Sequence, residues 1–279
     1  MSARTIKDAR GIALPVGGYR RVVSLVPSVT ETLVELGLGE RLVGRTRFCV
    51  HPSPQVDALP AVGGTKTPDL EAIAALEPDL VIACREENRR EDVEDLEGSG
   101  LAVHLIDPRD LDGVRRFLTD LGALLELKDP VDALLAALDA ARHRARDFAA
   151  ALRAAGGAPR TLCLIWRRPW MAAGHDCYID GVMRELGLVN TAPDSGRYPA
   201  LGDADLAALA PTLLLLPSEP YAFEARHARE LVDLGVAPDA AACLLVPGED
   251  LSWYGSRSPR ALDALRGLLA ERLGLETAP

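Results

Sequence analysis

Aromatic residues are scarce in this chain of 279 residues, in which four Phe, three Trp and five Tyr amount to only 4%. Hydrophobic residues of all kinds still reach 48%, so aliphatic side chains must build most of the core. The positions of the few rings are therefore informative, because something other than bulk core packing has to explain them.

A net positive charge and long apolar runs are also missing. The net charge of −10 argues against nucleic acid or an anionic membrane as the main partner, since both require a basic face. No apolar run approaches the roughly 20 residues needed to span a bilayer. The amino-terminal sequence MSARTIKDARGIALP lacks the apolar segment of a secretory signal, and the five scattered cysteines favour free thiols. We expect a cytoplasmic protein without disulfides; the alternative is a periplasmic or extracytoplasmic protein whose leader is missing.

Common catalytic motifs are absent as well. The sequence contains neither G-x-S-x-G nor H-E-x-x-H, and GGTKTP lacks the spacing of a phosphate-binding loop. Cys49 and His51 could form a nucleophile pair, but no third residue that would orient the imidazole is evident. We therefore predict a protein that is not an enzyme and has no catalytic residues.

Strand-like and helix-like segments alternate in both halves of the chain, which predicts an α/β fold with parallel sheets. After a lead-in over 1–20, an N-terminal lobe is expected over 21–127 and a C-terminal lobe over 158–279. The two halves share a short echo, DLEAIAALEPDLVIA and DADLAALAPTLLLL, in which a short helix, a Pro break and a buried strand follow one another. The pattern predicts two Rossmann-like lobes of similar build.

Residues 128–157 separate these lobes and have a sustained helical period. Asp129 is suited to the N-cap and Pro130 to the first helical position, while Gly156 and Gly157 signal the end. About 26 residues would form a rod of about 40 Å, which predicts a strut joining the lobes. The alternative is a long crossover helix within a single sheet. We expect the cationic run Arg142–Arg146 on this helix to be a solvated face.

Most of the rings stand in predicted loops or at strand ends, namely Phe48, Trp166, Trp170, Tyr178, Tyr198, Tyr221, Phe223, Trp253 and Tyr254. Loops at the carboxyl ends of parallel strands are where open sheets bind ligands. The rings therefore predict an aromatic cleft for a large planar or caged organic ligand. The alternative is that each ring covers the edge of its own core.

Polar residues in the same loops are further candidates. Four of them could contact such a ligand: His51, Glu86, Glu219 and Arg257. The Arg257 guanidinium could donate to a carboxylate or amide oxygen of the ligand. Cys49, His51 and Cys84 could instead bind a metal directly, although their spacing matches no zinc pattern, and we predict no protein-bound metal. His104 stands in an apolar strand, where we expect a hydrogen-bonded core histidine.

Several segments occur together in an order typical of one family: RRVVSLVPSVTETLVELGLGERLVG, DLEAIAALEPDLVIA, GVMRELGLVN and SWYGSRSPRALDAL. With these segments the chain resembles the helical-backbone, class III substrate-binding proteins of ABC importers over roughly residues 20–275, and most of all the vitamin B12-binding members. The resemblance implies two lobes joined by a rigid helix, with a corrinoid or iron chelate held in the cleft between them.

The resemblance also assigns residues. Phe48, Trp166, Trp170, Tyr198 and the loop Trp253–Arg257 match ligand-contacting positions of the B12 binders. Two tryptophans typical of those proteins are replaced by Thr65 and Cys84. Glu71 matches the first carboxylate that docks on a permease, whereas the second position falls on Ala204, and we assign its role to the neighbouring Asp205. FCVHP, REEN, SEPYAF and SWYGSR resemble a cytoplasmic-type branch without a signal.

We therefore predict a monomeric binding protein for a small-molecule metal chelate, with cobalamin or a related corrinoid as ligand and no prosthetic group. The predicted ligand contacts are Phe48, His51, Glu86, Trp166, Trp170, Tyr198, Glu219, Tyr221, Trp253, Tyr254 and Arg257. The alternatives are an importer receptor for a ferric siderophore or haem, an intracellular metal or cofactor carrier, and a corrinoid-modifying enzyme. Replacing Trp170 or Trp253 by Ala is expected to weaken binding without unfolding the protein.

Overall fold

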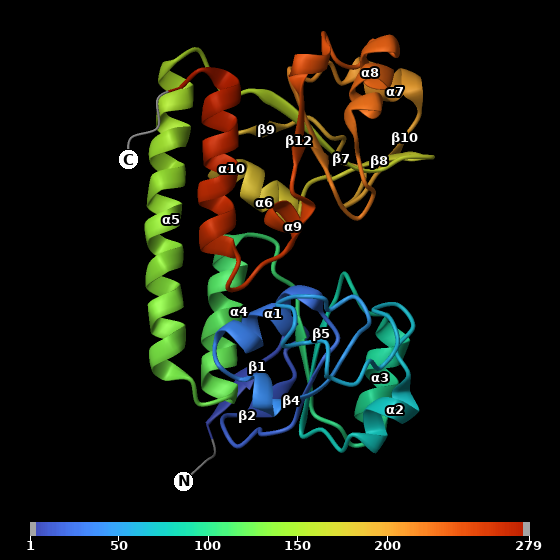
Figure 1. Cartoon of the computed structure of the whole chain (residues 1–279), viewed down its shortest axis with the longest axis vertical. Helices are drawn as coiled ribbons and strands as arrows, with labels where there is room; N and C mark the ends of the chain where they lie inside the picture. The colour runs from blue at the N-terminus through green and yellow to red at the C-terminus, as the bar shows by residue number, and fades with distance from the viewer. Residues whose placement is uncertain (1–3, 276–279) are drawn as a thin grey trace. The chain divides into compact units, whose positions relative to one another are not determined.

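A computed structural model describes residues 4–275, and the chain forms two compact units (Figure 1). The N-terminal unit contains the chain up to Pro108 together with Asp112–Ala136 and Tyr254–Arg257. The C-terminal unit contains Arg109–Leu111, Ala137–Trp253 and the chain from Ser258 onward. Each unit thus includes one short segment from the other half of the chain.

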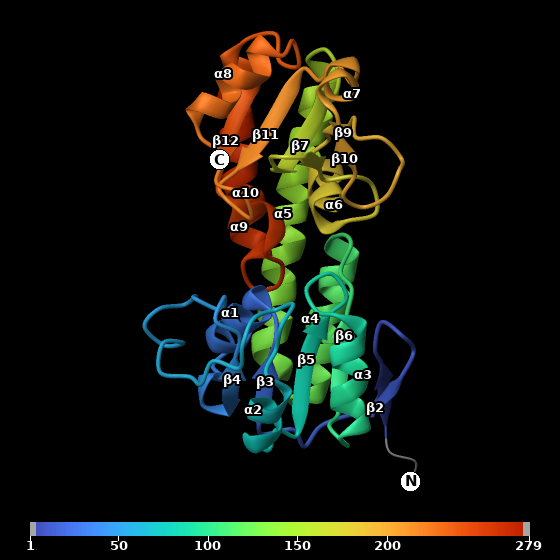
Figure 2. The ribbon, with the colours of Figure 1, turned by 90° about the vertical axis from the view of Figure 1, so that its right-hand side faces the viewer.

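A parallel sheet in the order β4-β3-β5-β6 forms the centre of the N-terminal unit, and Figure 2 shows these strands side by side. Its strands are β3 (Val22–Ser24), β4 (Leu42–Arg45), β5 (Leu80–Cys84) and β6 (Val103–Ile106). The sheet runs in both directions from β3, so the topological switch point lies between the loops that follow β3 and β5. An antiparallel hairpin of β1 (Thr5–Lys7) and β2 (Ala13–Pro15) precedes it.

The helices of this unit are α1 (Pro27–Glu35), the 3₁₀ turn Gly39–Arg41, α2 (Leu70–Ala75), α3 (Arg90–Gly98) and α4 (Leu111–Leu124). Ile73 of α2 and Leu96 of α3 pack with Val81 on one face of the sheet. Asp69 caps α2 as its sequence predicts, accepting a hydrogen bond from the Ala72 backbone at 3.0 Å.

Helix α1 begins earlier than its sequence suggests. Ser28 and Thr30 are typical N-cap residues, but the helix starts at Pro27 and both lie inside it. Thr30 instead donates a hydrogen bond to the carbonyl oxygen of Val26 at 3.2 Å, which satisfies its buried hydroxyl. Pro27 can begin the helix because the first helical residues need no intrahelical N–H donor.

The sheet of the C-terminal unit has the order β10-β8-β7-β11-β12, with β9 also paired to β7. Its strands are β7 (Arg160–Trp166), β8 (Trp170–Ala172), β9 (Val189–Asn190), β10 (Ala200–Leu201), β11 (Leu213–Pro217) and β12 (Cys243–Val246). The strands β7, β9, β11 and β12 pair in parallel, whereas β8 and β10 pair antiparallel. The predicted α/β class with parallel sheets is confirmed, and the antiparallel additions are too short to be evident from sequence.

Helices of this unit are α6 (Tyr178–Glu185), α7 (Asp203–Ala208), α8 (Ala225–Asp233), the 3₁₀ turn Ala240–Ala242, α9 (Gly248–Ser252) and α10 (Ser258–Leu273). The core between sheet and helices contains Leu162, Leu164, Leu214 and Leu216 from the central strands. Leu231 of α8 and Leu206 of α7 pack on the same side.

The echo between the two halves is visible in equivalent contacts. Arg21 lies just before β3, and its guanidinium donates to the two backbone carbonyls that follow α2, at 2.6 and 3.0 Å. Arg160 begins β7, and its guanidinium donates to the two carbonyls that follow α7, at 2.7 and 3.5 Å. In both units a cation therefore satisfies the free carbonyls at the end of the short helix that precedes the Pro break.

Helix α5 spans Lys128–Ala154, which corresponds to a length of about 40 Å. Its residues up to Ala136 belong to the N-terminal unit, and those from Ala137 belong to the C-terminal unit. The predicted N-cap is wrong, because the helix begins at Lys128 and Asp129 lies in its first turn, where its charge still favours the free N–H groups.

The cationic face of α5 differs from expectation. Arg142 is buried and its Nε donates to Glu185 of α6 at 2.9 Å. Arg144 donates to Asp263 of α10 at 2.6 and 2.8 Å. The prediction of a solvated face is therefore wrong for these two residues, because α6 and α10 supply carboxylates beside them.

Candidate ligand-binding site

In the N-terminal unit, the loop after β4 exposes a ring at the carboxyl edge of the sheet. The side chain of Phe48 is 48% exposed, and the Arg47 guanidinium lies 5.0 Å from its ring centroid. Gly64 supports the ring from beneath, since a Cβ at Gly64 would lie 3.2 Å from Phe48. An exposed, supported ring with a neighbouring cation can stack on a planar anionic ligand.

Asn88 holds the loops of this region together, and no sequence motif singled it out as an individual residue. Its amide donates to the backbone oxygen of Thr65 at 2.9 Å and to that of Leu25 at 3.4 Å. Its side-chain oxygen accepts from the Cys84 backbone at 2.8 Å. A single buried amide thus ties the ends of β3 and β5 to the loop that precedes α2.

The residues considered for direct metal binding lie nearby, in an unfavourable environment. Cys49 and Cys84 are buried, and burial raises the pKa of both thiols, that of Cys84 to about 12. Metals bind the thiolate, so neutral thiols are poor ligands. His51 and Glu86 are half-buried. Within residues 4–275, His, Cys, Asp and Glu side chains form no group of three able to hold a metal ion.

The segment Tyr254–Arg257 packs onto α1. The Ser256 backbone donates to Thr32 Oγ1 at 3.0 Å. A Cβ at Gly255, which has φ +102°, would lie 2.1 Å from the same oxygen, so only glycine fits there.

Two predicted ligand contacts in this segment have partners within the protein. Arg257 donates to both carboxylate oxygens of Glu31, at 2.6 and 2.9 Å, and Tyr254 is buried against Phe117. Ligand contacts by Tyr254 and Arg257 stay predictions.

In the C-terminal unit, five rings gather where β7 and β11 end, and we name them the C-terminal ring cluster: Trp166, Trp170, Tyr221, Phe223 and His227. The centroid of Tyr221 lies 5.7 Å from Trp166, 4.9 Å from Phe223 and 5.4 Å from His227. Trp170 stacks on Phe223 with an angle of 6° between the rings. The structure thus brings together three predicted contact residues, Trp166, Trp170 and Tyr221.

Trp166 presents this cluster to solvent, with 42% of its surface exposed, whereas Trp170 is only 6% exposed. The Arg167 guanidinium lies 5.3 Å from the Trp170 ring and forms an ion pair with both oxygens of Glu230, one of them at 2.7 Å. The hydrogen bonds from Arg167 lower the pKa of Glu230. Arg167 directly follows Trp166 in sequence, a signal by which it could have been found.

His227 completes the cluster as a neutral ring. Its Nδ1 accepts a hydrogen bond from the Glu224 backbone at 2.9 Å, and its Nε2 lies 3.2 Å from Tyr221 Oη. Burial and the neighbouring Arg226 and Arg167 lower the pKa of His227. A neutral His227 therefore orients the Tyr221 hydroxyl at physiological pH.

Glu219 and Trp253, both predicted contacts, are brought together. The Trp253 Nε1 donates to Glu219 Oε1 at 2.6 Å, and Trp253 is only 8% exposed. Tyr198 is half-buried in the loop before β10. Because Trp170 and Trp253 are buried, truncating either removes core packing and should lower stability. That such variants bind more weakly and still fold stays a prediction.

The two candidate docking carboxylates both lie in the first turn of a helix. Glu71 is exposed in the first turn of α2, and Asp205 is exposed in the first turn of α7. The neighbouring Asp203 accepts a hydrogen bond from Trp170 Nε1 at 3.0 Å. The docking roles of Glu71 and Asp205 stay predictions.

Residues 22–225 match the model of a family described as "Periplasmic binding protein", which is nearly three quarters of the chain. The chain belongs to this family. Among curated proteins, the vitamin B12-binding protein of Pectobacterium atrosepticum is 32% identical over 124 residues, 43% of this chain and 44% of that protein. The match thus spans less than half the length of this relative.

Among solved structures, a periplasmic haem-binding protein from Pseudomonas aeruginosa is 27% identical with a TM-score of 0.80, over 94% of this chain and 96% of that one. The periplasmic haem-binding protein BhuT, solved with two haems, is 28% identical with a TM-score of 0.78, over 92% and 100% of the chains. These likenesses confirm the predicted relationship to substrate-binding proteins of ABC importers, whose members bind ligands without transforming them.

Two findings bear on the location of the protein. Among residues 4–275, no helix is long and apolar enough to cross a membrane. The family's description names the periplasm, which does not support the predicted cytoplasmic location. That location stays a prediction from the amino-terminal sequence.

Proposed function

We propose that this protein binds a metal tetrapyrrole, either a cobalamin-like corrinoid or a haem. The observation that carries the proposal is an exposed ring with an arginine nearby at the strand ends of each unit. Arg47 lies over the Phe48 ring, and Arg167, which follows the exposed Trp166 in sequence, lies over the Trp170 ring. A tetrapyrrole offers a wide apolar face for the rings, and the acidic side chains of a haem or the phosphate of cobalamin would suit the guanidinium groups.

The relatives support this ligand class from two directions. The 32% identical segment belongs to a protein named for vitamin B12, and the structures at 27–28% identity are named for haem. Both ligands are metal macrocycles with polar edges. The C-terminal ring cluster suits the apolar macrocycle face that both ligands share. Titration distinguishes which metal and which edge groups the protein binds.

The proposal is tested by titrating the purified chain with cyanocobalamin, dicyanocobinamide and haemin, following tryptophan fluorescence. We expect one of them to bind, and Trp166→Ala and Phe48→Ala each to weaken its binding about tenfold. Val189→Ala removes an equally exposed apolar side chain from β9 and should leave the affinity unchanged. Binding of a ferric siderophore alone, or unchanged affinity in both ring variants, would contradict the proposal.

We also propose that an ABC permease is the partner and that Glu71 and Asp205 dock on it. Both carboxylates are exposed in the first turn of their helices, α2 and α7, which supports this. The double variant Glu71→Ala/Asp205→Ala should bind the solubilised permease of the same organism at least tenfold more weakly and retain its ligand affinity. Glu94→Ala, which removes another exposed carboxylate, serves as the control. Equal permease binding by the wild type and the double variant would refute this docking role.

A further inference from the structure

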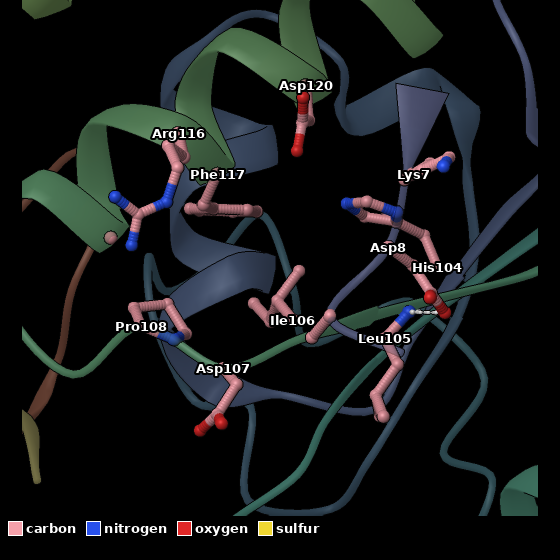
Figure 3. Close-up of a pocket in the computed structure, with 12 residues that line it drawn as sticks. Lys7, Asp8, His104, Leu105, Ile106, Asp107, Pro108, Arg116, Phe117 and Asp120 are labelled. Carbon is pink, nitrogen blue, oxygen red and sulfur yellow. Dashed lines mark hydrogen bonds between the residues drawn. The ribbon is translucent and has the colours of Figure 1, made fainter. Parts of the chain in front are cut away.

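A cavity in the N-terminal unit is lined by none of the residues predicted to contact the tetrapyrrole. Its volume is about 330 Å³, at the lower end for small-molecule sites. Figure 3 shows it bordered by the amino-terminal strand, by β6 and by α4. The lining residues are Lys7–Ala9, His104–Pro108, Gly113, Arg116, Phe117 and Asp120.

His104 is the unusual residue of this cavity. It is 1% exposed, and neither Nδ1 nor Nε2 has a hydrogen-bond partner among residues 4–275. Its neighbours Val103 and Leu105 point into the apolar core on one face of β6, so His104 faces the α4 side. Figure 3 shows its imidazole directed into the space that Asp120 and Phe117 border. Buried polar groups in native proteins are usually satisfied, so this orphaned ring indicates a missing partner.

Across the cavity, α4 supplies a carboxylate. Asp120 is half-buried, and within residues 4–275 the structure records no hydrogen bond to its carboxylate oxygens. Burial raises the pKa of Asp120 to about 6, with Arg116 acting in the opposite direction. At neutral pH this carboxylate is therefore charged and incompletely solvated, which favours a cation or hydrogen-bond donor beside it.

The other charged groups around the cavity are engaged elsewhere or face solvent. Asp8 accepts from the Arg10 guanidinium at 2.6 and 2.8 Å, and Asp107 lies 3.5 Å from Arg85. Lys7 and Arg116 are exposed, and Figure 3 shows their charged ends directed away from the imidazole. Solvent screens these two cations. The charges that act on the His104 ring are those of Asp8 and Arg10, which oppose each other, and Asp120 is the cavity carboxylate that no hydrogen bond engages in the described part of the chain.

We propose that this cavity binds a small organic ammonium ion, whose N–H groups donate to the Asp120 carboxylate and to one His104 nitrogen. An ammonium has donors and no acceptors, which matches a carboxylate and the lone pair of a neutral imidazole. Its alkyl part packs against Phe117 and Ile106, and the Phe117 ring offers a further cation contact.

The test compares n-butylammonium, n-butanol and n-butyrate, three probes of similar size and different charge, by calorimetric titration of the full chain. Only n-butylammonium is expected to bind at pH 7.5, with an affinity that falls below about pH 6 as Asp120 is protonated. Asp120→Asn should lower the affinity tenfold or more. Asp112→Asn changes a carboxylate of the same helix that does not line the cavity, and it should have no effect.

A second measurement follows the His104 ring signals by NMR in the wild type, where n-butylammonium should shift them and the two other probes should not. The unfolding curve of unliganded Asp120→Asn verifies that this variant is folded. Equal binding of n-butanol or n-butyrate, an unchanged affinity in Asp120→Asn, or the absence of binding by all three probes would overturn the proposal.

Discussion

Replacing Arg257 by Ala should lower the free energy of unfolding by about 3–5 kcal/mol, because a buried carboxylate loses the two charged hydrogen bonds that Arg257 donates to it. Glu31 is 2% exposed on α1 and accepts two hydrogen bonds from Arg257, at 2.6 and 2.9 Å. Two buried, parallel hydrogen bonds form the strongest type of ion pair, and breaking one partner costs more than the pair contributes. Urea denaturation of the purified variant measures the loss.

The matched control is Arg90→Ala, whose ion pair with Glu94 is exposed on α3. That variant should lose less than about 1 kcal/mol. The double variant Glu31→Leu/Arg257→Leu should regain much of the loss, since no uncompensated charge remains buried. If Arg257→Ala is no less stable than Arg90→Ala, the Glu31 carboxylate is solvated and our account of this contact is wrong.

Between pH 7.5 and pH 4, the free energy of unfolding of the wild type should fall by about 3 kcal/mol more than that of His104→Leu. Burial lowers the pKa of His104 to about 4, whereas an unfolded histidine titrates near 6.5. Above pH 6.5 both states hold a neutral ring. Below it the unfolded state binds the proton first, so the stabilisation is lost as pH falls from 6.5 through 4.

Asp120 titrates with the opposite sign, because burial raises its pKa to about 6, and the folded state takes up that proton first. The two titrations therefore partly cancel, and the free energy of unfolding of the wild type changes less with pH than the titration of His104 alone would cause. The informative quantity is the difference between the wild type and His104→Leu at each pH from 7.5 to 4. His143→Gln, at an exposed position on α5, is the control and should show no such difference. A difference that stays constant with pH would contradict a buried neutral His104.

The sequence predicts where most of the rings stand in the fold and does not predict what they contact. Rings that follow strands lie at one edge of a sheet, because parallel strands end there. Trp166, Tyr221 and Phe48 are exposed or half-buried there, whereas Trp170 and Trp253 are buried by neighbours distant in sequence. Sequence spacing does not reveal such neighbours, and it gives no sign that Glu31 lies beside Arg257.

By itself the sequence determined the α/β class, the long helix and the loops that carry the rings, since periodicity and Gly and Pro signals act over a few residues. The tertiary structure alone decided which side chains are buried and paired. It placed Arg142 against Glu185, gathered the C-terminal ring cluster, and left His104 without a partner. Burial and pairing depend on contacts between segments far apart in the chain, and local pattern holds no information about them.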